Sequence, residues 1–201
     1  EMDWEHQRNI RTDLLNYTYN TGYELYDGSQ GGEDAAGNPS AAQLVNIING
    51  GVGVMSYTGH GYEGGCATTG LDMSDVYTLQ NMGKLPFFWS VACVNGAFVD
   101  GTCFAEALLR SENNGQPIGC VATLMSTINQ SWNPPMSGQD EMVDILTEQF
   151  DDKPMRSFGG ISYNGCMQMN DDYGADGEAM TDSWTCFGDP TLMVRTDVPA
   201  N

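Results

Sequence analysis

The sequence predicts an α/β fold in which helices cover both faces of a mostly parallel sheet. Segments compatible with helix and with strand alternate along the chain. Two strand candidates, 86–94 (PFFWSVACV) and 119–127 (GCVATLMST), are apolar in a continuous run rather than in alternation. Continuous apolar strands are typical of sheets that are covered on both faces. We therefore expect an α/β sandwich.

The elements follow from local signals. Residues 5–17 lack Gly and Pro and predict a helix, 24–26 predict a short strand, and 27–40 form a loop rich in Gly, Asp, Asn and Pro. Ser40 is the expected N-cap of a helix that runs through Ile48. The remaining expectations are strands at 52–57, 86–94 and 119–127, helices at 73–81, 103–113, 138–150 and 163–173, and a last strand within 185–194, interrupted by Gly188-Asp189-Pro190.

Length and composition predict one domain. The chain has 201 residues with 40% hydrophobic content, enough for one core and too little for two. No run approaches the ~18 apolar residues of a membrane helix, so no membrane insertion is expected. The start lacks the basic and apolar regions of a signal peptide, and we expect any targeting segment to have been removed.

The charge balance restricts the partners. The chain has 27 Asp and Glu against 7 Lys and Arg, a formal charge of −20. This charge disfavours nucleic acids and anionic membranes and favours cationic partners or substrates. An acidic coat for solubility or for a salty habitat explains it equally well. Structural calcium is a third interpretation, at the loop 31–34 and the acidic run 170–172, although neither has EF-hand spacing.

The cysteines and histidines predict no metal site. Six cysteines occur without a C-x-x-C pair, and only His6 and His60 could join them as zinc ligands. Most of the cysteines are expected to be small buried hydrophobes, with a disulfide or two as the alternative if the protein is exported. His6 is expected to be structural.

One histidine and one cysteine follow successive strand candidates. His60 lies three residues beyond Tyr57 in a glycine-rich turn, and Cys93 ends the next apolar strand. Sites in open α/β sheets lie beyond the carboxyl ends of the strands, so imidazole and thiol can meet there. Histidine can accept the thiol proton, and the resulting thiolate attacks carbonyl carbon. Structural roles for both residues remain the alternative.

Six motifs resemble the gingipains, secreted cysteine endopeptidases that share a fold with caspases and legumain. The order of the motifs is the same, the resemblance extends from about Glu1 to Pro199, and it is strongest to the arginine-specific branch. It implies a caspase-like three-layer sandwich. The motifs are 57–61 (YTGHG), 91–96 (VACVNG), 103–108 (CFAEAL), 126–132 (STINQSW), 138–142 (GQDEM) and 187–190 (FGDP).

The resemblance implies a role for each candidate site residue. Cys93 is the nucleophile, His60 is the general acid and base, and the amides of Gly61 and Cys93 form the oxyanion hole. Asp3 is the acid at the base of the S1 pocket, where a planar guanidinium binds a carboxylate better than an ammonium does. The other expected pocket residues are Trp132 and Met136 as apolar walls, Gln130 as a polar contact, and Thr58 and Val91 as further wall.

The family pattern also implies parts that this chain does not contain. The first central strand and a glutamate that assists the catalytic histidine are expected before Glu1, so residues 1–201 form a catalytic domain that lacks its first strand. A companion N-terminal chain, cut from the same precursor before Glu1, is expected to supply both. By analogy, the protein is secreted or at the cell surface of a bacterium.

Two other functions remain open. One is a non-catalytic module that keeps the fold and binds Arg-rich peptides or proteins, and the other is a Lys-specific or mixed protease. The intact His60 and Cys93 argue against the first, and Asp3 argues against the second. No cofactor is expected to be required for the chemistry.

Overall fold

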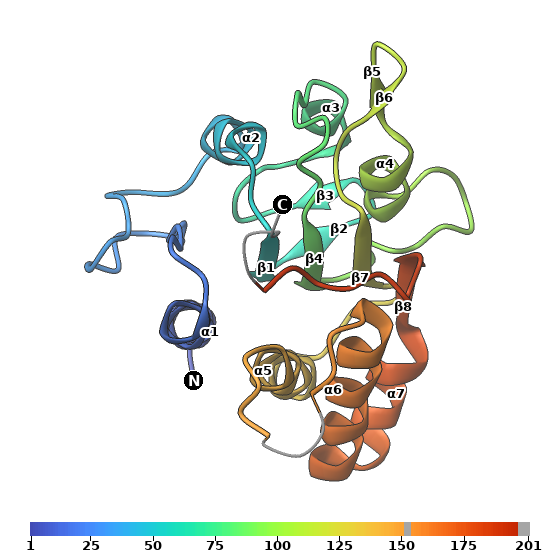
Figure 1. The fold of residues 1–201 in the computed structure, drawn as a ribbon. Helices are drawn as coiled ribbons and strands as arrows, with labels where there is room; N and C mark the ends of the chain where they lie inside the picture. Colours follow the sequence, from blue (N-terminus) through green and yellow to red (C-terminus); the bar gives the residue numbers. More distant parts are fainter. Residues whose placement is uncertain (151–153, 197–201) are drawn as a thin grey trace.

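The centre of the computed structural model is a four-stranded sheet with the order β1-β4-β7-β8 (Figure 1). The structure describes residues 1–150 and 154–196. Strands β1, β4 and β7 are parallel, and β8 pairs with β7 in the antiparallel sense. The prediction of a mostly parallel sheet is confirmed. The strands are β1 (Val54–Thr58), β4 (Phe87–Val91), β7 (Ala122–Ser126) and β8 (Trp184–Gly188).

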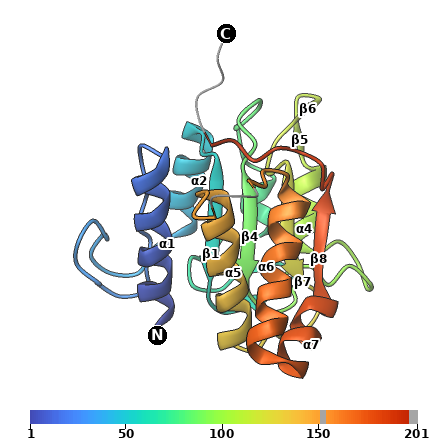
Figure 2. The ribbon, with the colours of Figure 1, turned by 60° about the horizontal axis from the view of Figure 1, so that its bottom comes forward.

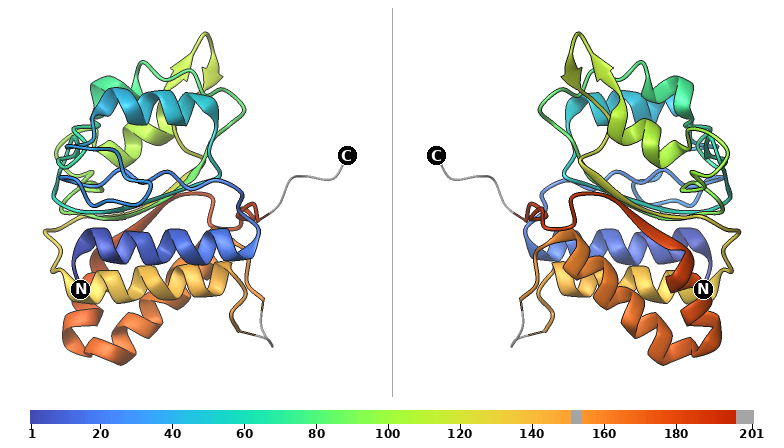
Figure 3. Two further views of the ribbon diagram at one scale, coloured as in Figure 1. Left: turned by 90° about the vertical axis from the view of Figure 1, so that its left-hand side faces the viewer. Right: turned by 90° about the vertical axis from the view of Figure 1, so that its right-hand side faces the viewer.

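Helices form a layer on each face of this sheet, as Figure 3 shows. One layer contains α2 (Ala41–Gly50), α3 (Met73–Val76) and α4 (Phe104–Arg110). The other contains α1 (Asp3–Tyr17), α5 (Asn133–Leu146), α6 (Phe158–Tyr173) and α7 (Ala175–Ser183). None of the described helices combines the length and the apolar character needed to cross a membrane.

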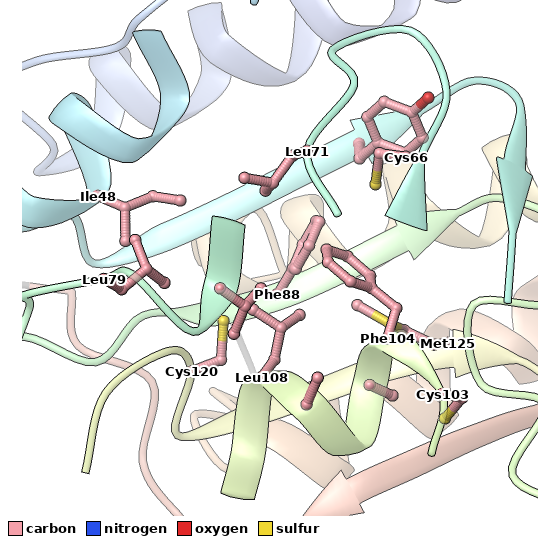
Figure 4. Close-up of a cluster of buried hydrophobic side chains, with 14 of the residues drawn as sticks. Ile48, Cys66, Leu71, Leu79, Phe88, Cys103, Phe104, Leu108, Cys120 and Met125 are labelled. Atoms are coloured by element: carbon pink, nitrogen blue, oxygen red, sulfur yellow. The ribbon is translucent and has the colours of Figure 1, made fainter. Parts of the chain in front are cut away.

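The central strand β4 explains the continuous apolar run, because all five of its residues are buried. Phe88 points into the core under α2 to α4, with Phe104 and Leu108 (Figure 4). Phe87 and Trp89 point to the opposite face and stack on Phe158, with ring centroids 5.3 and 5.1 Å apart. Burying each such side chain contributes about 1.5–3 kcal/mol, so both faces require apolar residues.

Capping and terminating residues in the sequence define the ends of α2 and the start of α5. Ser40 caps α2: its side chain accepts from the Gln43 amide, and the Gln43 side chain accepts from the Ser40 amide. Gly51, with φ +100°, ends the same helix. Helix α5 begins at Asn133, earlier than the expected residue 138, because proline fits the first turn, where no amide partner is needed.

The expected strand at 24–26 is wrong. These residues pair with no strand, and the Glu24 carboxylate, 2% exposed, instead binds two arginines of α1. Its oxygens lie 3.0 Å from Arg8 and 3.6 Å from Arg11. The short apolar pattern therefore reflects packing on α1 rather than strand pairing. The loop over 27–40 is confirmed, since it contains no helix or strand.

Other boundaries differ from expectation. Helix α3 stops at Val76 rather than at 81, and α4 stops at Arg110 rather than at 113. A hairpin follows α4, with Asn114 and Gly115 in the left-handed region at φ +51° and +72°. Elements that were not predicted are α7, the hairpin strands β5 (Glu112–Asn113) and β6 (Gln116–Pro117), and the pair β2 (Gly61–Tyr62) and β3 (Gly65–Cys66).

Candidate active site

The sheet brings the loops that carry His60 and Cys93 side by side. Strands β1 and β4 are parallel neighbours in which Thr58 pairs with Val91. His60 and Cys93 each lie two residues beyond that pair, and the Gly59 amide donates to the Val91 carbonyl at 3.1 Å. His60 is exposed and Cys93 is half-buried. Imidazole and thiol therefore belong to the same carboxyl edge.

The turn that carries Cys93 has an unusual backbone. Val94 has φ +49°, in the left-handed region that β-branched residues rarely adopt. The amides of Val94 and Gly96 donate to the carbonyls of Ile128 and Ser126, at 3.0 and 2.8 Å. The Cys93 amide donates to no backbone carbonyl among the described residues. It can therefore donate to an external oxygen.

Asn95 connects the Cys93 loop to the β2–β3 hairpin that follows His60. Its amide nitrogen donates to the carbonyls of Tyr62 and Gly65, both at 2.8 Å. Its oxygen accepts from the Ser90 hydroxyl at 3.1 Å, and the residue is fully buried. Buried hydrogen bonds of this kind hold the two loops in one arrangement. The sequence assigned no role to Asn95, although it lies within a family motif.

Gly61 lets these two loops approach each other. A Cβ atom added at this position would lie 2.8 Å from both the Ala92 side chain and the Cys93 carbonyl. Such contacts are too short for a side chain, so any residue other than glycine would push the His60 loop away from Cys93.

A third loop, which follows β7, completes the edge. The Gln130 carbonyl lies 4.0 Å from the Cys93 sulfur, and the Trp132 ring lies 5.8 Å from the His60 ring at a 45° tilt. Trp132 is 37% exposed. The side-chain oxygen and nitrogen of Gln130 are buried without a hydrogen-bond partner among the described residues. The hydrogen-bonding capacity of this amide is therefore unused within the described part of the chain.

The other expected pocket residues occupy two different environments. Val91 and Met136 belong to the core under α5 to α7, where they are 1% and 5% exposed. Asp3 begins α1, and it lines a cavity of about 430 Å³ between α1, α2 and β1 together with Thr58. No described Lys or Arg forms an ion pair with Asp3. Its carboxylate can therefore receive a cation.

Gln139 of α5 fixes the first turns of α1 against β1, which lies beside both helices in Figure 2. Its amide nitrogen donates to the carbonyls of Tyr57 and Trp89, at 3.2 and 3.3 Å. Its oxygen accepts from the side chains of His6, Gln7 and Thr58 at 2.8–2.9 Å. The sequence missed this network, although GQDEM contains the glutamine.

The comparisons with known proteins identify the family. The model of peptidase family C25 matches residues 3–195. The chain belongs to peptidase family C25. Its sequence is 43% identical over 200 residues to Gingipain R2 and to Gingipain R1 of Porphyromonas gingivalis. The aligned part is 99% of this chain but only 26% and 19% of those relatives.

Solved structures of the family have the same fold. The Arg-specific cysteine proteinase gingipain R superimposes with a TM-score of 0.89 and 40% identity, covering all of this chain and 44% of that one. A complex of the pro- and mature domains of RgpB from Porphyromonas gingivalis superimposes with a TM-score of 0.88 and 41% sequence identity. That match covers all of this chain and 45% of the other. The resemblance to the gingipains and the three-layer caspase-like fold are thereby confirmed.

The cysteines of this C25 chain differ in environment. All six are free. Burial raises the pKa of the Cys66 and Cys120 thiols, and it raises that of Cys166 to about 12. Burial and then the charge of Asp189 raise the pKa of Cys186 to about 11. Within the described residues, no disulfide joins any two of these cysteines.

The two expected calcium sites are the loop 31–34 and the acidic run 170–172, which lies within α6, and each uses an acid in internal hydrogen bonds. Asp34 accepts from the amides of Tyr26 and Gln30, at 3.1 and 3.0 Å. Asp172 accepts from Ser137 and Gln168, at 2.8 and 3.0 Å. Calcium at these two places stays a prediction.

Proposed function

We propose that this C25 chain carries the catalytic residues of a cysteine endopeptidase that cleaves after arginine. The observation that carries the proposal is the convergence of the His60 and Cys93 loops beyond the paired residues Thr58 and Val91. The hydrogen bonds of Asn95 support it, because they hold these two loops together.

The proposed reaction proceeds through a thioester. His60 takes the thiol proton of Cys93, and the sulfur attacks the carbonyl carbon of the scissile bond. The amides of Gly61 and Cys93 stabilise the oxyanion. The carbon–nitrogen bond then breaks, and His60 gives its proton to the leaving amine. Water attacks the thioester with His60 as base, releasing the carboxylate and restoring the thiol.

Arginine selectivity is proposed to depend on Asp3. Its carboxylate lacks an ion-pair partner among the described residues, and a guanidinium can form two parallel hydrogen bonds with it. The exposed Trp132 ring can cover the substrate stem. Gln130, whose amide is buried without a partner among the described residues, is the proposed polar contact near the head of the substrate side chain. Val91 and Met136 would support the pocket from the core. The names of relatives, Gingipain R and Arg-specific proteinase, agree with this assignment.

We also propose that a companion polypeptide of the same precursor adds a strand to β1. In the described part of the chain, β1 pairs only with β4, and an apolar cavity lies beside it. Val54 and Met55 of β1 are only partly buried there. Purification followed by mass spectrometry tests this: a second polypeptide should co-elute with activity, and an active fraction with only an unbroken precursor contradicts it.

Secretion or attachment to the surface of a bacterial cell is the proposed location. It is supported by the similarity to proteins of the bacterium Porphyromonas gingivalis and to a structure with a pro-domain. Fractionation of the producing cells tests the proposal, and recovery of the mature chain only in the cytosol would contradict it.

The activity is tested with matched fluorogenic peptides that carry Arg, Lys or Ala at P1. The assembled wild-type protein should cleave the Arg peptide, and Cys93→Ala should abolish turnover. Equal cleavage after Arg and Lys would show that the protease has mixed specificity and is not selective for Arg. Absence of turnover, with retained binding of Arg-rich peptides, would instead indicate a non-catalytic binding module.

A further inference from the structure

Three metal-ligating side chains meet where the start of α1 packs on α5, outside the catalytic loops. The ligand atoms of Glu1, His6 and Asp140 all lie within 4.8 Å of one another. Nδ1 of His6 is 3.1 Å from the Asp140 carboxylate and 4.0 Å from that of Glu1. The His6 side chain is fully buried, whereas Glu1 and Asp140 are 38% and 48% exposed. Histidine therefore forms the floor of a site that opens to solvent.

The Gln139 network fixes which histidine nitrogen carries a proton. The carbonyls of Tyr57 and Trp89 accept from the Gln139 nitrogen, so the Gln139 oxygen faces His6. Nε2 of His6 lies 2.8 Å from this oxygen and must donate to it. In neutral imidazole only one nitrogen carries a proton, so Nδ1 then presents a lone pair to the carboxylates of Glu1 and Asp140.

That arrangement requires a positive charge. Nδ1 is buried and has no hydrogen-bond partner among the described residues, because its approach to Asp140 lacks hydrogen-bond geometry. Burial lowers the pKa of His6, but its pairing with Asp140, together with Gln139 and Glu1, raises it by more. A proton on Nδ1 is thus one way to supply the charge, and a metal ion is the other.

The surrounding charge favours a divalent ion over a proton. Asp13 and Asp144 interact electrostatically with Asp140 and add to the negative charge around it. In the described part of the molecule, no Lys or Arg forms an ion pair with these acids or with Glu1. One proton balances only one of the two carboxylates that face His6, whereas a divalent ion balances both.

We propose that Glu1, His6 and Asp140 bind a first-row divalent metal ion such as Zn²⁺. Imidazole nitrogen with carboxylate oxygen suits these ions, whereas Ca²⁺ prefers oxygen alone. The Nε2–Gln139 hydrogen bond matches the second hydrogen bond that metal-bound histidines usually make. The ion would link the first residues of α1 to α5. This site departs from the expectation, drawn from the sequence, that His6 is structural.

Isothermal titration with Zn²⁺ tests the site in the whole protein after iodoacetamide has blocked Cys93, since a free thiolate also binds zinc. One zinc ion per chain should bind, and excess Ca²⁺ should not displace it. Asp140→Asn and Glu1→Gln should each weaken binding at least about tenfold. Glu141→Gln removes the same charge from the neighbouring residue of α5, which lies outside the cluster, and should leave the affinity unchanged.

Circular dichroism first establishes that each variant is folded, and zinc should raise the melting temperature of wild type but not of Asp140→Asn. Nitrogen NMR of His6 supplies the second readout, because zinc should shift Nδ1 while Nε2 keeps its proton. Equal zinc affinity in all variants would overturn the proposal. So would the absence of stoichiometric binding, which would leave the proton as the charge that His6 carries. Neither readout depends on peptidase activity.

Discussion

The two flanks of the sheet are built differently. Around β8, helices α5, α6 and α7 fill the space, and the buried Trp184 donates from its indole to the Ser90 carbonyl at 3.1 Å. Around β1, a cavity of about 430 Å³ lies between α1, α2 and the strand, and polar side chains connect α1 to the sheet. The β8 flank therefore contributes mainly to folding stability, whereas the β1 flank carries Asp3 and is where the proposed companion strand would add.

Glycine contacts show the same contrast at atomic scale. A Cβ added at Gly165 of α6 would lie 2.5 Å from both the Gly138 carbonyl and Met142 of α5. A Cβ added at Gly53, before β1, would meet only the Tyr19 ring at 3.7 Å, an ordinary contact. Substitutions on the β8 flank should therefore reduce folding stability. Substitutions of site residues on the β1 flank, such as Asp3, should reduce activity without unfolding the protein.

Among substitutions outside the catalytic pair, the largest effect is expected from Asp3→Asn. Loss of the carboxylate leaves the guanidinium of a bound substrate without its counter-charge, at a cost of about 3–5 kcal/mol. The specificity constant kcat/KM for an Arg peptide should fall at least about 100-fold, while that for a Lys peptide falls less. Asp13→Asn, on the same helix, is the matched control. Equal losses of kcat/KM in both variants would contradict a role for Asp3 in the S1 pocket.

Asn95→Ala should reduce kcat/KM by about 100-fold, because the loops of His60 and Cys93 lose the hydrogen bonds that position them. The rate at which iodoacetamide labels Cys93 should also change its pH dependence, which a purely structural defect would not alter. Asn164→Ala, at an exposed site on α6, should change neither. An unchanged labelling profile in a folded Asn95→Ala protein would contradict the positioning role.

Gly165→Ala compared with Gly53→Ala tests the packing contrast directly. We expect the first to lower the free energy of unfolding by about 1–3 kcal/mol through overpacking. The second should change it by less than about 0.5 kcal/mol. Urea unfolding of the two variants measures both values. If Gly53→Ala costs as much as Gly165→Ala, the β1 flank is as tightly filled as the β8 flank.

The smallest effect is expected at the α2 cap. Ser40→Ala should cost about 1 kcal/mol of stability, since the Gln43 amide loses its acceptor, whereas Ser40→Gly should cost a few tenths. Thermal unfolding monitored by circular dichroism compares the two. A larger loss in the glycine variant would show that the hydroxyl is not the stabilising group.

The sequence by itself determined the elements whose signals are local. The apolar run at 86–94 specified the doubly covered strand β4, Ser40 specified the start of α2, and the alternation of elements specified a mostly parallel sheet. It also placed His60 and Cys93 beyond neighbouring strands, because parallel strands end at the same edge. Asn114-Gly115 would have predicted the β5–β6 hairpin as well, since both positions adopt positive φ.

Only the tertiary structure decided which distant side chains meet. Gln139 contacts Thr58 across 81 residues of sequence, and Asn95 contacts the carbonyl of Tyr62 across 33. The 24–26 segment has the sequence pattern of a strand, but in the structure Glu24 binds two arginines of α1. Such partners depend on how complete elements pack, and no periodicity or capping signal within a short segment encodes them. The cluster at His6 has the same origin, because α1 and α5 create it together.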